Sequence, residues 1–117
     1  MVMRKRAPER GNKPFAAGSA VVVYLREPLA KFWGVIRSID QTGVVVEGVD
    51  LRSFDEFVRG AASGEISPRD VTMAFYPLPR VEKILLDRGS ESAPSLLDQF
   101  RARVGSGLAE FLKPPKR

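Results

Sequence analysis

Five short runs of β-branched and aromatic residues, each bounded by turn-forming residues, limit most strongly what this chain can fold into. They lie at residues 19–26, 31–40, 44–50, 71–76 and 80–87. Runs of this length and composition are typical of buried β-strands. A long excursion follows the third run, whereas only Pro77-Leu78-Pro79 separates the fourth from the fifth. This order favours a small antiparallel barrel, in which closure protects the strand edges from pairing with other chains.

The second run carries apolar residues on both of its faces. Because successive side chains of a strand point to opposite sides, they divide into two sets: Trp33, Val35 and Ile39 on one face, and Phe32 and Ile36 on the other. Burial on both faces is typical of a strand that bends around a corner, and Gly34 is the natural position for the bend. The neighbouring rings of Phe32 and Trp33 fit either the core or an exposed stacking platform flanked by basic residues.

The sequence predicts helices in two further segments. Ser53, followed three residues later by Glu56, is a helix-start signature and predicts a short helix at about 53–60, ended by Gly60. We expect a flexible loop over 61–70. Ser95 opens a second segment, in which Leu96, Leu97, Phe100 and Val104 recur at helical spacing and the apolar residues continue to Leu112.

Gly105 and Gly107 interrupt the second helical segment, so either one weakened helix or two short helices would fit. Its apolar stripe would either cover the barrel's open end or dock a partner. The fold class predicted is therefore mainly β: a five-stranded, strongly bent antiparallel barrel of Sm-like or SH3-like type, with a short inserted helix and a C-terminal helical region.

Charge divides the chain into three segments. The formal net charge is +5, but residues 1–14 carry +4 and residues 113–117 carry +3, which leaves −2 for the part between them. The sequence thus predicts a basic, flexible tail over 1–18, one domain over 19–112 and a short basic tail over 113–117. Basic tails bind nucleic acids or anionic surfaces without sequence preference, although a simple solubilising role explains them equally.

The residues needed for most catalysis are missing. The chain has no cysteine and no histidine, which removes disulfides, thiolate chemistry and the commonest metal ligand and general base. Four carboxylates lie near one another in sequence without a motif that brings them together: Glu47, Asp50, Asp55 and Glu56. We expect no catalytic residues, no metal, no cofactor and no small-molecule substrate. No apolar run reaches the roughly 20 residues of a membrane span, and the cysteine-free composition fits the cytoplasm.

Several of these segments resemble the Sm-like family of small β-barrels, which includes the bacterial RNA chaperone Hfq. The resemblance covers residues 20–87 and rests on the apolar run at 21–25, on Gly34 in the bent strand, on Ile39-Asp40 at its end and on the strands at 71–76 and 80–84. It implies a non-enzymatic module that assembles with copies of itself and binds RNA. Ring closure in this family pairs the fourth strand of one subunit with the fifth of the next. We therefore expect a homo-oligomer, either a ring or a dimer.

The resemblance also places candidate RNA contacts, to which the basic tail adds its cations: Arg4, Lys5, Arg6, Arg10, Lys13, Asp40, Gln41, Tyr76 and Arg80. Two departures support an alternative. Thr42-Gly43 stands where the family has a base-contacting polar residue, and Pro77-Leu78-Pro79 replaces the basic and imidazole positions that follow the tyrosine in Hfq. The alternative is a protein-interaction or scaffold module of the same fold that has lost RNA binding.

Overall fold

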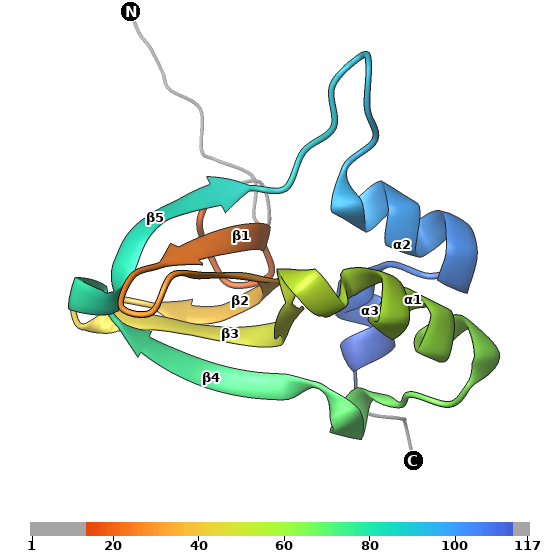
Figure 1. The fold of residues 1–117 in the computed structure, drawn as a ribbon, viewed down its shortest axis with the longest axis horizontal. Helices are drawn as coiled ribbons and strands as arrows, with labels where there is room; N and C mark the ends of the chain where they lie inside the picture. The colour runs from red at the N-terminus through yellow and green to blue at the C-terminus, as the bar shows by residue number, and fades with distance from the viewer. Residues whose placement is uncertain (1–13, 114–117) are drawn as a thin grey trace, which may run out of the picture.

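The predicted strands form a single antiparallel sheet. The computed structural model describes residues 14–113. Its strands are β1 (Ala20–Leu25), β2 (Ala30–Ile39), β3 (Gly43–Asp50), β4 (Thr72–Pro77) and β5 (Val81–Leu86). They are hydrogen-bonded in the order β4-β3-β2-β1-β5 (Figure 1). The prediction of five antiparallel strands is confirmed, and each strand boundary lies within one residue of the position expected from the sequence.

The sheet is not closed into the predicted barrel. Within the described residues β4 and β5 form the two edges and do not pair with each other. A short 3₁₀ helix, η3 (Leu78–Arg80), joins them at one end. The N–H of Leu78 donates to the carbonyl of Thr42 at 3.0 Å, and the N–H of Arg26 donates to the carbonyl of Arg80 at 2.9 Å. From there the two strands run apart (Figure 1). Proline offers no N–H, so this proline-rich connection cannot begin a ladder between them.

Two glycines face each other across β2 and β3. Gly34 of β2 pairs with Gly48 of β3. A side chain on either residue would overlap the carbonyl group of the facing strand. The register between β2 and β3 also shifts between Ile36 and Ser38. Gly34 therefore has the restricted position that the sequence indicated, and Gly48 shares it.

The curved sheet buries one apolar cluster on each side. The inner cluster is formed by Val21, Val23, Leu25, Phe32, Ile36, Val44 and Val46, with contacts from side chains of β4 and β5. The outer cluster joins the sheet to the helices through Trp33, Val35, Phe54, Phe57, Val58, Ala61, Phe100, Leu108 and Leu112. The predicted separation of Trp33 from Phe32 is confirmed, but both rings are buried, so neither provides a stacking platform. Ile39 is 38% exposed, contrary to prediction, because the register shift alters the alternation beyond Ile36.

The inserted helix begins where the sequence predicted and ends later. A 3₁₀ turn, η1 (Leu51–Ser53), leads into α1 (Phe54–Ser63). Gly60 lies buried inside α1 rather than at its end, and the helix ends at Gly64, whose φ of 86° is in the left-handed region. Ser53 makes no capping hydrogen bond. The expected loop over 61–70 holds the last residues of α1 and a further 3₁₀ turn, η2 (Pro68–Asp70).

The C-terminal segment forms two helices that cover the sheet. These are α2 (Leu96–Val104) and α3 (Leu108–Leu112), separated at Gly105, whose φ is 99°. The hydroxyl of Ser95 accepts the N–H of Asp98 at 2.9 Å and caps α2. The apolar stripe of this segment packs on the outer face of the sheet, so its helices complete the core. Because residues 14–113 contain three α-helices beside the sheet, the domain is α/β rather than mainly β (Figure 1).

Candidate functional site

The structure brings together two connections that were predicted to carry RNA contacts. Asp40 and Gln41 lie in the turn between β2 and β3, and Tyr76 and Arg80 flank the connection between β4 and β5. The register pairs Gly43 with Pro77, and the two connections share the hydrogen bond from the Leu78 N–H. Residues far apart in sequence therefore lie at one end of the sheet.

The side chain of Asp40 shapes its own turn. One carboxylate oxygen accepts the N–H and the hydroxyl of Thr42, at 2.8 and 2.6 Å, and the N–H of Gly43 at 3.3 Å. The hydroxyl and backbone hydrogen bonds from Thr42 hold the pKa of Asp40 below its usual value. An ionised carboxylate held in this way is a turn-forming group. Gln41 beside it is exposed.

Tyr76 and Arg80 are both partly buried. The ring of Tyr76 packs edge-on against Phe32, with the ring centroids 5.8 Å apart. Burial raises the pKa of the Tyr76 phenol, and the positive charge of Arg80 opposes that shift. The Nε of Arg80 is itself buried. Both side chains are therefore partly buried, and Tyr76 packs against the inner cluster.

The five tail candidates Arg4, Lys5, Arg6, Arg10 and Lys13 lie outside the described residues. The described part of the predicted tail, residues 14–18, forms turns before β1. The N–H of Gly18 donates to the carbonyl of Ile36 at 2.8 Å, and residues 14–17 lie near the end of β2.

The two sheet edges expose apolar side chains. On β4, Met73 is 58% exposed and Phe75 is 53% exposed, and on β5, Leu85 is 43% exposed. All three occupy alternate positions that the inner cluster does not use. The sequence predicted these edge strands, but it did not indicate which of their side chains would remain uncovered.

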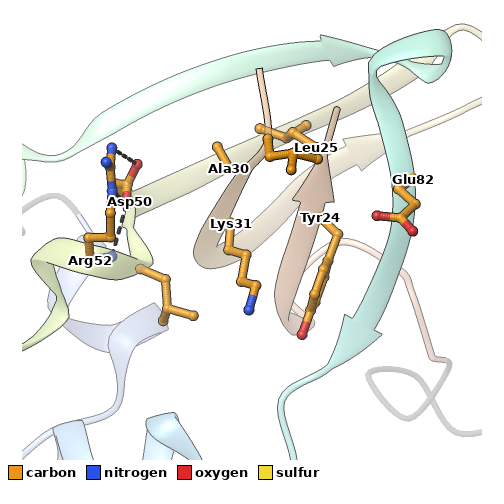
Figure 2. A pocket seen from close by; sticks show the side chains of 9 residues that line it. Tyr24, Leu25, Ala30, Lys31, Asp50, Arg52 and Glu82 are labelled. Carbon is orange, nitrogen blue, oxygen red and sulfur yellow. Dashed lines mark hydrogen bonds and ion pairs between the residues drawn. The ribbon is translucent and has the colours of Figure 1, made fainter. Parts of the chain in front are cut away.

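A hollow of about 530 Å³ lies over the β1–β2 hairpin, between η1 and β5 (Figure 2). Its lining comprises Tyr24, Leu25, Leu29, Ala30, Lys31, Asp50, Leu51, Arg52 and Glu82. The ammonium groups of Lys31 and Lys83 lie 5.0 and 4.8 Å from the centroid of the Tyr24 ring. Sequence reasoning missed this arrangement, because only the register of three strands shows that these residues are neighbours.

One wall of the hollow is an ion pair. The Nε and the terminal nitrogen of Arg52 each lie 3.0 Å from an oxygen of the Asp50 carboxylate, which also accepts the N–H of Arg52. These hydrogen bonds from Arg52 lower the pKa of Asp50. Asp50 is thereby neutralised, and the remaining charged residues of the lining are Lys31 and Glu82, with Lys83 nearby over the ring of Tyr24.

Comparisons with protein-family models, with curated proteins and with solved structures found no match to this chain. Across residues 14–113, no group of three or more metal-ligating side chains gathers into a candidate ion site. No helix in that part of the chain has both the length and the apolar character needed to cross a membrane. The features that bear on function are therefore the sheet edges, the hollow and the distribution of charge.

Proposed function

We propose that this protein is a non-catalytic module of Sm-like type that assembles with copies of itself, through pairing of the β4 edge of one copy with the β5 edge of the next. The observation that supports this proposal most directly is the presence of two uncovered strand edges, both with exposed apolar residues, on the two sides of one sheet. The closure that the single chain lacks would then be reached between copies.

The backbone of both edges supports such pairing. In the described chain β4 pairs only with β3, and β5 pairs only with β1, so each leaves a row of N–H and C=O groups without a sheet partner. Each strand has six residues, which is an ordinary length for pairing. Pro77 stands at the end of β4, and β5 contains no proline. Bare edges of this kind readily pair with another chain.

One antiparallel register matches the side chains of the two edges. It places Met73 opposite Leu85, and it sets Phe75 opposite Lys83 on the same outer face. On the inner face, Ala74 then lies opposite Ile84. Cross-strand apolar pairs each add roughly 0.2–1 kcal/mol to sheet stability. A lysine opposite a phenylalanine also gains from the attraction between a cation and a ring.

Cysteine cross-linking tests this register cleanly, because the chain contains no cysteine. We expect the double variant Met73→Cys/Leu85→Cys to form a series of disulfide-linked oligomers on mild oxidation, since each copy would carry two facing positions. The matched control Met73→Cys/Glu91→Cys moves the second cysteine to an exposed residue beyond the edge and should give no such series. Light scattering that returns only the monomer mass of 12.9 kDa at micromolar concentration would reject the assembly.

A second candidate function, RNA binding, is supported by charge. The basic character of the chain is concentrated in residues 1–14 and 113–117, whereas the part between them is mildly acidic. We expect retention on immobilised RNA to fall steeply with salt and to be lost when both segments are deleted. Tight binding by the trimmed chain would show that the charge argument is wrong. Absence of binding by the full chain would favour the scaffold function.

A further inference from the structure

The hollow over the β1–β2 hairpin combines an apolar floor with a cationic end. Leu25, Leu29, Ala30 and Leu51 contribute the apolar surface. Figure 2 shows the ammonium group of Lys31 and the hydroxyl of Tyr24 at neighbouring positions, with both side chains extending in the same direction. An ammonium group and a phenol are both donors, so this end of the hollow presents two hydrogen-bond donors side by side.

The positive charges at this end are not compensated. Within the described part of the chain, neither Lys31 nor Lys83 forms an ion pair. The two ammonium groups come from β2 and β5, the strands on either side of β1, and both approach the ring of Tyr24. Two cations near one ring repel each other, and an anion placed between Lys31 and the phenol would relieve that repulsion.

The other charges define how such an anion would be oriented. The Asp50 carboxylate is already occupied by Arg52. Glu82 lies on β5, across the hollow from Asp50 and Arg52, and makes no ion pair within residues 14–113 (Figure 2). Its negative charge repels a second anionic group. The hollow is therefore suited to a ligand with one anionic end, directed toward Lys31 and Tyr24, and an apolar body.

A nucleobase fits this site poorly. Stacking on an aromatic side chain requires an open ring face. The ammonium groups of Lys31 and Lys83 both lie over the ring of Tyr24, where a stacking base would compete with them. The volume of about 530 Å³ is within the range of pockets that hold small organic molecules.

We propose that this hollow is a binding site for a small amphipathic carboxylate, whose anionic end is held by Lys31 and Tyr24 and whose apolar body lies on Leu25, Ala30 and Leu51. The ammonium group of Lys83 adds positive charge near the position of the ligand's carboxylate. The residues that hold the ligand come from the β1–β2 hairpin and η1, whereas β5 contributes only Glu82 to the lining, so octanoate binding can be tested whether or not the edges pair.

Octanoate is a suitable probe, and the signals of Ala30 and Leu51 in NMR spectra of the full chain report on its binding. We expect saturable shifts that are confined to the hollow. Lys31→Gln removes one charge-assisted hydrogen bond and should weaken binding at least about tenfold. Tyr24→Phe, which keeps the ring, should weaken binding less. Arg88→Gln removes an exposed cation beyond the hollow and should leave the affinity unchanged.

Three results would overturn the proposal. The first is an absence of shifts at millimolar octanoate, with the spectrum showing a folded protein. The second is equal binding of 1-octanol, which would mean that the cations contribute nothing. The third is tighter binding of adenosine monophosphate than of octanoate, which would identify a nucleotide site. If the variant Lys31→Arg binds octanoate with nearly the affinity of the original chain, that result would instead support recognition by charge.

Discussion

The outer face of the sheet and the β4 edge carry similar apolar residues, which are buried on the outer face and exposed at the edge. On the outer face the helices cover Trp33, whose ring centroid lies 5.1 Å from that of Phe54 and 5.9 Å from that of Phe100. On β4, Met73 and Phe75 are more than half exposed. The chain thus completes its core on one surface and leaves another uncovered. Apolar content alone does not distinguish the two, because the difference depends on whether the same chain supplies a covering element.

The largest expected effect is a loss of folding stability on truncating a buried ring, which the same truncation at the exposed edge should not cause. Phe100→Ala should lower the free energy of unfolding by about 3–5 kcal/mol, since the ring is fully buried and packs against Trp33, Phe57 and Phe111. Phe75→Ala should change it by less than about 1 kcal/mol and reduce assembly instead. Urea denaturation and light scattering measure the two quantities. Equal loss of stability in both variants would remove the distinction between a completed core and an uncovered edge.

Much of the secondary structure could be predicted from the sequence, because short local patterns of residues determine it. The strands were predictable from β-branched runs bounded by turn residues, and the break at Gly105 left two helices as one of the expected outcomes. The open edges were not predictable in the same way. Barrel closure depends on whether β4 reaches β5, and that depends on the curvature of the whole sheet and on the hydrogen bonds of η3.

The candidate site was less accessible from the sequence, because it depends on register. Asp40 and Arg80 were predicted as RNA contacts, but the carboxylate of Asp40 is used within its own turn and the Nε of Arg80 is buried. The neighbourhood of Tyr24, Lys31 and Lys83 comes from three strands. Which residues face one another across strands follows from pairing, which no single run of sequence reveals.

The second prediction concerns the glycine pair Gly34 and Gly48, which lies between the inner and the outer cluster. Gly34→Val and Gly48→Val should each lower the free energy of unfolding by about 1–3 kcal/mol, because a side chain at either position overlaps the facing backbone. Thermal unfolding measures the effect. Gly18→Val is a useful contrast, because an added Cβ at this position has no neighbouring atom within 4 Å. Any loss of stability in this variant would come from the φ of 96°, which strains every residue other than glycine. Unchanged melting temperatures at Gly34 and Gly48 would mean that the facing backbone does not restrict these positions.

The third prediction concerns the link between the edge strand β5 and the helices. The carboxylate of Asp87 accepts the indole N–H of Trp33 at 3.0 Å and the N–H groups of Leu96 and Leu97 at 2.9 and 2.7 Å. Asp87→Ala leaves these donors unpaired and should cost about 1–2 kcal/mol. Trp33 is the only tryptophan, so its fluorescence reports the change. An unaltered emission spectrum together with unaltered stability would show that α2 is held by apolar packing alone.

The smallest expected effect is a response to acid at the rim of the hollow. The pKa of Asp50 is lowered in the folded chain by its hydrogen bonds with Arg52, from an ordinary value of 3.8. A depressed carboxyl pKa stabilises the fold above the unfolded value and loses that contribution as the pH falls through the folded value. The stability difference between the original chain and Asp50→Asn should therefore be constant above about pH 5 and shrink below about pH 4. Arg52→Gln should reduce the same pH-dependent difference, because it removes the cation. A difference that persists unchanged at pH 2 would mean that Asp50 acts through its cap on η1 and not through its charge.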